Sequence, residues 1–172
     1  MIDDLDRRLL ALLQQDATLT VAQLSERVGL STTPCWKRVK RLEDEGYIER
    51  KVAILNRAKV GLPVTVFVSI RTSQHDEKWL NEFAAAVSRM PEVIELYRMS
   101  GEVDYLMKVV TSDIGGYDRF YKRLIKSVKL NDVSSTFAME QIKYSTEVPL
   151  DAVQAMGGLR RGAGEERPDS AR

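Results

Sequence analysis

Residues 31–42 read STTPCWKRVKRL and place four cations, but no acid, on a segment with helical patterning. Thr33 is the expected N-cap, and Pro34 suits the first helical position, where its missing N–H would have no partner anyway. The apolar positions recur at the spacing of one helix face: Cys35, Val39 and Leu42. A helix with one buried edge and a basic outer face can lie against a nucleic-acid duplex while a scaffold holds its other side.

Two further helices are predicted before this basic helix. Residues 3–15 place leucines at helical spacing behind three aspartates, which the helix dipole favours near a helix start. Thr20 and Gln23 match a capping box for the next helix, and Gly29 supplies its stop. The short connection to the basic helix forces a sharp turn, which predicts a helix-turn-helix with the basic helix as the reader.

The second half of the chain has a different pattern. Strands are predicted at 64–70, 93–99, 105–111 and 134–145, and helices at 78–90 and 117–128. The order βαββαβ is that of two interlocked βαβ units on one antiparallel sheet, the ferredoxin-like arrangement. Residues 47–55 mix β-branched and charged side chains and predict a small strand or wing. The predicted fold is therefore α+β, with an N-terminal winged helix-turn-helix followed by a ferredoxin-like βαββαβ domain.

Composition shifts divide the chain into four segments. We expect a helix-turn-helix domain at 1–55, a linker at 56–63 that contains Gly and Pro, and the βαββαβ domain at 64–150. Residues 151–172 are rich in glycine and charge and are expected to be disordered.

The overall charge is nearly balanced, with 26 Lys and Arg against 25 Asp and Glu and a formal net charge of +1. The chain is therefore not expected to coat nucleic acid through bulk electrostatics, because its positive charge is local. No apolar run approaches the roughly 20 residues that span a bilayer, and the amino terminus has no signal-peptide pattern. We expect a cytoplasmic protein without a membrane partner.

The sequence argues against an enzyme. Cys35 is the single cysteine and His75 the single histidine, so neither an internal disulfide nor a Cys/His zinc site can be assembled. His75 lies in a polar stretch and is expected in an exposed loop, while Cys35 is expected to be a small buried hydrophobe and not a redox sensor. No nucleotide loop or nucleophile–base pair is present, and no cofactor or metal is expected.

The basic helix supplies the candidate DNA-binding residues. Arg38 and Arg41 are the candidates for base edges, because a guanidinium can meet guanine O6 and N7 with two parallel bonds. Lys37 and Lys40 are expected to hold phosphates. Trp36 either packs on the sugar–phosphate backbone or closes the domain core, and packing on the backbone is favoured. The candidate set is Ser31, Thr32, Thr33, Pro34, Trp36, Lys37, Arg38, Lys40 and Arg41.

Three stretches together resemble the Lrp/AsnC, or feast/famine, family of bacterial transcription regulators. They are LSTTPCWKRVKRLE at 30–43, GEVDYL at 101–106, and SSTF at 134–137 leading to IKYST at 142–146. The resemblance covers roughly residues 2–150. It implies a second domain of the RAM/AsnC type that binds an amino-acid effector, and homodimers that assemble further, to octamers for example.

Within this family, TPCWKR at 33–38 and FAMEQIKY at 137–144 look closest to regulators that switch on cysteine-degrading enzymes in response to L-cysteine. From the residues alone, Gly101 and Asp104 are explained by hairpin-turn chemistry. The family resemblance implies instead that this loop holds the effector, with Asp104 accepting its ammonium and exposed backbone N–H groups at Gly101 binding its carboxylate. The implied effector-binding set is Met99, Ser100, Gly101, Asp104, Tyr105 and Thr136.

These observations predict a sequence-specific DNA-binding regulator of amino-acid metabolism. An amino-acid effector, with L-cysteine as the candidate, would act by changing the oligomeric assembly. Two alternatives stay open: a metabolite-binding module, and a nucleoid-type structural protein that binds random and promoter DNA alike. The sequence leaves open whether the regulator activates or represses.

Overall fold

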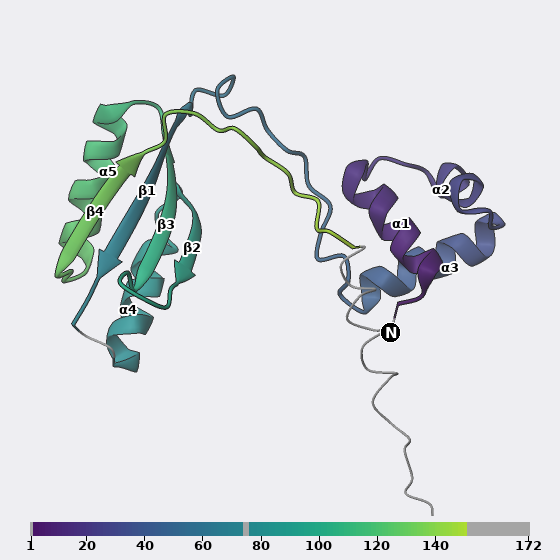
Figure 1. Cartoon of the computed structure of the whole chain (residues 1–172), viewed down its shortest axis with the longest axis horizontal. Coiled ribbons are helices and arrows are strands. Elements are labelled where there is room, and N and C mark those ends of the chain that lie inside the picture. Colours follow the sequence, from purple (N-terminus) through teal and green to yellow (C-terminus); the bar gives the residue numbers. More distant parts are fainter. Residues whose placement is uncertain (1, 74–75, 151–172) are drawn as a thin grey trace, which may run out of the picture. The chain divides into compact units, whose positions relative to one another are not determined.

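Helices α1 (Asp4–Gln15), α2 (Val21–Val28) and α3 (Thr32–Asp44) form the first unit of the chain (Figure 1). Thr20 and Gln23 close the predicted capping box on α2, and Gly29 ends that helix in the left-handed conformation at φ 72°. The buried side chains between the helices are mainly apolar: Leu9, Leu13, Leu24, Val28, Cys35, Val39 and Leu42. The apolar edge predicted for the basic helix is therefore confirmed.

This computed structural model describes residues 2–73 and 76–150. His75 and the tail at 151–172, for which exposure and disorder were expected, lie outside the described residues. In the part that is described, no helix is long and apolar enough to cross a membrane.

The chain divides into two units after Ala53. The second unit is Ile54–Lys143, and the chain then returns to the first unit, so residues 144–150 belong with the helices. The second compact unit ends at Lys143, and the domain bounds expected at 64–150 stay a prediction.

A side-chain clamp holds the returning segment to α1. The Gln14 amide donates to the carbonyl oxygen of Val148 at 3.1 Å and accepts from the Val148 N–H at 3.0 Å. Gln15 Nε2 also donates to Glu147 Oε2 at 3.2 Å. The Gln14 side chain satisfies both the N–H and the carbonyl oxygen of Val148. The backbone at Val148 therefore needs no neighbouring strand.

Helix α3 begins earlier than the sequence predicted. Its N-cap is Ser31, whose side chain makes no capping hydrogen bond, so Thr33 is not the cap and Pro34 stands third in the helix. The earlier start is tolerated because the first N–H groups of any helix lack an intrahelical acceptor, and Pro34 therefore gives up no bond.

The second unit carries an antiparallel sheet in the order β2-β3-β1-β4 (Figure 1). Its strands are β1 (Val64–Arg71), β2 (Val93–Arg98), β3 (Tyr105–Thr111) and β4 (Asp132–Phe137), and its helices are α4 (Glu77–Val87) and α5 (Ile114–Ser127). The predicted βαββαβ order and ferredoxin-like topology are confirmed. Helix α5 starts earlier than predicted because the Asp113 side chain accepts from the Gly116 N–H and caps it.

Two strand predictions were wrong. No strand forms over residues 47–55, and the strand predicted at 134–145 ends at Phe137. Phe137 pairs with Val66 and the Ala138 N–H donates to the Thr65 carbonyl at 3.0 Å, which brings the chain to the start of β1, where the pairing ends. Exposed β-branched and apolar residues suit a strand only where a neighbouring strand supplies the hydrogen bonds.

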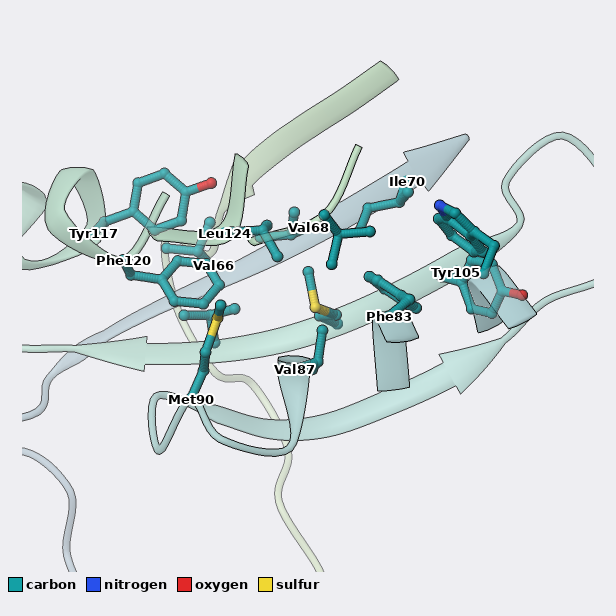
Figure 2. Close-up of a cluster of buried hydrophobic side chains, with 14 residues drawn as sticks. Val66, Val68, Ile70, Phe83, Val87, Met90, Tyr105, Tyr117, Phe120 and Leu124 are labelled. Atoms are coloured by element: carbon teal, nitrogen blue, oxygen red, sulfur yellow. The ribbon is translucent and has the colours of Figure 1, made fainter. Parts of the chain in front are cut away.

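The core of the second unit lies between the sheet and its two helices (Figure 2). Val66, Val68 and Ile70 alternate along β1 on the face toward the helices and are fully buried. Phe83 of α4 and Phe120 of α5 complete this layer from the helix side. Both helices cover the same face of the sheet, so no helix described in this unit covers the other face.

One carboxylate is buried among the apolar side chains of the first unit. Asp6 is 0% exposed, and both of its oxygens accept charged hydrogen bonds from α3. Arg38 Nη1 lies 2.8 Å from Oδ1, and Arg41 Nη2 lies 2.5 Å from Oδ2. The backbone N–H of Asp3 donates to the same carboxylate at 3.0 Å, and the Asp3 side chain accepts from the Asp6 N–H at 2.8 Å. The first turn of α1 is thereby tied to the middle of α3.

These contacts set the acidity of the buried group. Burial alone would raise the pKa of Asp6, but hydrogen bonds from Arg41, from the Asp3 N–H and from Arg38 outweigh burial and lower the pKa from its ordinary 3.8 to about 2. A shift of this size corresponds to about 2 kcal/mol of folding free energy. Because the folded-state pKa is the lower one, this stability is present above pH 4 and is lost as the pH falls toward 2.

We predict that Asp6→Asn lowers the free energy of unfolding by about 2 kcal/mol at pH 7 and that the difference from the wild type shrinks as the pH falls from about 4 to 2. Urea unfolding of the full chain, followed by circular dichroism, measures both effects. Asp44→Asn is the matched control, because its pair with Lys40 is solvent-exposed and should contribute less than about 1 kcal/mol. Equal losses in the two variants would contradict the role of Asp6.

Candidate nucleic-acid interface and ligand loop

The outer face of α3 is accessible to a large partner. Trp36 is 53% exposed, so it does not close the core, and its packing on the sugar–phosphate backbone stays a prediction. Trp36 follows Cys35, which is fully buried, and one residue corresponds to about 100° around a helix. The indole of Trp36 therefore lies on the exposed side of α3, next to the basic side chains.

The two lysines of this face differ in their surroundings. Lys40 Nζ lies 2.8 Å from Asp44 Oδ1, and this hydrogen bond raises the pKa of Lys40. Lys37 is exposed and forms no ion pair with any residue in the described ranges. Lys37 is therefore the cation of α3 that is ready to meet a phosphate without first giving up a protein partner.

The arginines are engaged with Asp6, which the sequence analysis did not single out. A bidentate contact to guanine uses two guanidinium nitrogens, and here Arg38 Nη1 and Arg41 Nη2 are already bound to a buried carboxylate. A signal for this pairing was present in the sequence. Asp6 falls on the same helix face as Leu9 and Leu13, and an acid on a buried face needs a cation partner.

The start of α3 adds neutral donors to the basic face. Ser31, Thr32 and Thr33 are exposed, as is Pro34, and the Ser31 side chain is not used to cap its own helix. The N-terminus of a helix combines free N–H groups with a partial positive charge, which suits an anion such as a phosphate. Hydroxyls, free N–H groups and Lys37 thus lie along one exposed edge.

The loop between β2 and β3 is fastened at both ends. Gly101 has φ 118°, a conformation that side chains disfavour, and the Met99 N–H donates to the Asp104 carbonyl at 2.8 Å. Asp104 then reaches β1: its N–H donates to Ile70 O at 3.0 Å, and its Oδ2 accepts from the Thr72 N–H at 2.8 Å. Turn chemistry alone therefore explains part of what Gly101 and Asp104 do.

The six residues of the predicted effector set do not line one pocket within this chain. Met99, Ser100 and Gly101 are exposed on the loop, and Asp104 is half-buried at its base. Tyr105 is only 5% exposed and packs on Trp79 and Phe83, on the helix-covered side of the sheet. Thr136 is exposed and lies opposite Phe67 in the pairing of β4 with β1. Strand β1 therefore separates Thr136 from β3, the nearer of the two strands that the loop joins.

No group of three His, Cys, Asp or Glu side chains within residues 2–73 and 76–150 is placed to hold a metal ion.

Two family models match the two units. Residues 2–49 match the winged helix-turn-helix DNA-binding model, and residues 65–148 match the Lrp/AsnC ligand-binding domain. The DNA-binding transcriptional activator DecR of Escherichia coli is 55% identical over 152 residues, which span 88% of this chain and all of that protein. The chain belongs to the Lrp/AsnC family of transcription regulators.

Solved structures of this family support the fold. An AsnC family regulator from Agrobacterium tumefaciens has a TM-score of 0.86 at 58% identity, covering 88% of this chain and 99% of its own. A transcriptional regulator from Neisseria meningitidis in complex with L-Met has a TM-score of 0.85 at 32% identity, covering 89% and 99%. This Lrp/AsnC chain is thus a DNA-binding transcription regulator with a small-molecule ligand domain, and its relatives are regulators, not enzymes.

We predict that Lys37→Ala weakens DNA binding and lowers the slope of log K against log salt by about 0.9, the share of one phosphate contact. Fluorescence anisotropy over a salt series measures this slope. Lys126→Ala is the control, because Lys126 is also exposed but lies on α5 of the other unit. An unchanged slope for Lys37→Ala would remove Lys37 from the interface.

Proposed function

We propose that this Lrp/AsnC regulator binds specific operators through α3, responds to L-cysteine, and couples the two events through its oligomeric state. The proposal rests on the exposed basic side of α3, a helix that is fixed on α1 by the ion pairs of Arg38 and Arg41 with the buried Asp6. A rigidly mounted helix can enter a major groove without an ordering cost at the moment of binding. We also propose that it acts in the cytoplasm.

The geometry supports a division of roles along α3. Thr32, Thr33 and Lys37 are proposed to contact phosphates and base edges, and Trp36 to pack on the sugar–phosphate backbone. Ser31, Pro34 and Lys40 flank this contact region. Arg38 and Arg41, the candidates for base reading from the sequence, are proposed here to position the helix, because their nitrogens bind Asp6.

The effector proposal rests on the loop at 99–104. Its exposed backbone and the Asp104 carboxylate offer donors and an acceptor for an amino acid, and a relative of this fold was solved with L-Met. The Cys35 thiol is not the sensor in this proposal: it is fully buried, and burial raises its pKa. Thr136 would join such a site only from a neighbouring chain, since it lies away from the loop within its own.

The uncovered sheet face is the proposed dimer contact. Phe67 is 38% exposed there, and Tyr97 is 50% exposed next to the pair that Lys108 forms with Glu95. Glu95 accepts from both Lys108 and Tyr97, so these three side chains already have hydrogen-bond partners and cost less to bury. A second copy of the chain, face to face, would cover it, and dimers would then assemble further.

Gel-shift titration of the full chain on its own upstream intergenic DNA tests the function. We expect a complex that survives excess random competitor DNA and changes with L-cysteine. Equal binding to random DNA would identify a nucleoid-type protein, and no DNA binding would identify a metabolite-binding module. Regulation by a different amino acid only would keep the regulator and reject L-cysteine.

We predict that Asp104→Asn reduces L-cysteine binding at least tenfold while leaving the melting temperature unchanged. The amide oxygen can still accept from the Thr72 N–H, so the loop stays fastened, but the charge that pairs with an ammonium is gone. Calorimetric titration with L-cysteine gives the affinity. Glu102→Gln, on the same exposed loop, is the control, and equal affinities for Asp104→Asn and the wild type would place the effector elsewhere.

We predict that Phe67→Glu weakens dimerisation at least a hundredfold, because an unpaired charge buried in an interface costs about 3 kcal/mol or more. Sedimentation velocity should then show monomers at concentrations where the wild type is dimeric or larger. Ile114→Glu is the control, since Ile114 is 72% exposed at the start of α5, away from the open face. A Phe67→Glu protein that sediments like the wild type would contradict the proposed dimer face.

A further inference from the structure

The chain connects its two compact units twice. It passes from the unit of α1, α2 and α3, the helix unit, to the unit that carries the sheet, the sheet unit, after Ala53. It returns to the helix unit at Tyr144. The residues that follow β4, from Ala138 to Leu150, therefore form a second connection. How far a connection restrains two units depends on where it is fastened and on how much free chain lies between the fastenings.

The sheet unit fastens the start of the second connection. The Ala138 N–H donates to the Thr65 carbonyl at 3.0 Å, directly beyond the pairing of β4 with β1. Arg57 adds a bridge: its Nη1 donates to Thr65 Oγ1 at 2.8 Å, and its Nη2 donates to Gln141 Oε1 at 3.3 Å. The second connection is thus held to the sheet unit as far as Gln141.

The helix unit fastens the other end of the second connection at α1. The Gln14 amide bonds both the N–H and the carbonyl oxygen of Val148, and Gln15 Nε2 donates to Glu147 Oε2. Apolar burial adds little here, because Val148 is 60% exposed and Tyr144 is 58% exposed. Gln14 makes two of these three hydrogen bonds, so the fastening depends mainly on this one side chain.

The free chain between the two fastenings is short. Gln141 and Glu147 are six residues apart in the sequence. Even a fully extended chain limits the distance between their Cα atoms to about 21 Å. The second connection is therefore too short to let the helix unit move away freely while both of its ends stay fastened.

The first connection is fastened in a similar way. Lys51 Nζ lies 2.7 Å from Glu43 Oε1 of α3 on the helix side, and Arg57 holds the chain to β1 on the sheet side. One connection leaves a unit free to turn about it. Two connections that reach the helix unit at different places, the end of α3 and the end of α1, remove most of that freedom.

From these contacts we propose that residues 144–150 act as a second tether on the helix unit, with Gln14 as the positioning residue that fastens the tether. Opening the bonds at Val148 leaves the helix unit on the first connection alone, and the number of arrangements open to it rises. A restrained α3 is better prepared for a DNA groove, because fewer arrangements are given up on binding.

Pulsed electron paramagnetic resonance on the full chain tests the tether. Nitroxide labels at Glu26→Cys in α2 and Glu82→Cys in α4 report one distance between the units, and both positions are exposed. Cys35 is the single native cysteine and is fully buried, so it stays unlabelled. A tenfold excess of unlabelled chain restricts the signal to label pairs within one chain. We expect a narrow distance distribution for this parent protein.

Two variants open the tether in different ways. Val148→Pro removes the N–H that donates to Gln14, and Gln14→Ala removes both Gln14 bonds. Each variant should broaden the distance distribution at least twofold with an unchanged melting temperature, because neither residue is buried. Val148→Ala is the matched control. It keeps the N–H and shortens only an exposed side chain, so its distribution should keep the parent width.

An unchanged width in either variant would overturn the proposal. Broadening in Val148→Ala equal to that in Val148→Pro would do so as well, because the Gln14 bonds are intact in that control. If Gln14→Ala lowers the melting temperature, Val148→Pro decides alone, since it leaves α1 unaltered. The measurement needs neither DNA nor L-cysteine, so its result is independent of the tests of the proposed function.

Discussion

The pairing of Asp6 with two arginines of α3 is the constraint on which the first unit depends. A fully buried carboxylate is tolerated in an apolar core only when its oxygens are all satisfied, and here Arg38, Arg41 and the Asp3 N–H satisfy them. The result is directional: the contact sets how α3 lies on α1 and therefore which side of α3 faces outward. Apolar packing alone would permit α3 to rotate or slide, because hydrophobic contacts are not directional.

This constraint changes how the basic segment should be understood. Four cations lie within residues 37–41. Arg38 and Arg41 bind Asp6 and hold the helix, whereas the two lysines are exposed to solvent. We therefore propose that Lys37 and the hydroxyls at the start of α3 contact DNA, with Trp36 exposed beside them. In the second unit, the two helices cover one face of the sheet and leave the other face open to a partner. A hydrogen bond of the Asp104 side chain fastens the loop at 99–104 to the end of β1.

Local signals in the sequence were sufficient for much of this fold. The capping box at Thr20, the glycine stop at Gly29 and the βαββαβ order all depend on residues close together in the chain, and the structure confirms them. The errors concern tertiary partners. The strand at 134–145 is too long because β1 begins near the partner of Phe137, and Asp6 was missed as an anchor because its partners lie 32 and 35 residues away. The effector set could be named from family resemblance, yet one chain does not bring Tyr105 and Thr136 together.

We propose that Arg41 holds α3 in place through Asp6 and does not read a base. Binding of Arg41→Ala to an operator and to a full set of single-base variants of it tests this most directly. We expect a loss of affinity that is uniform across all sites, because a loosened helix weakens every contact alike. Relaxed preference at one base pair, by about 1 to 3 kcal/mol, would show that Arg41 leaves Asp6 to contact that base and would contradict the account.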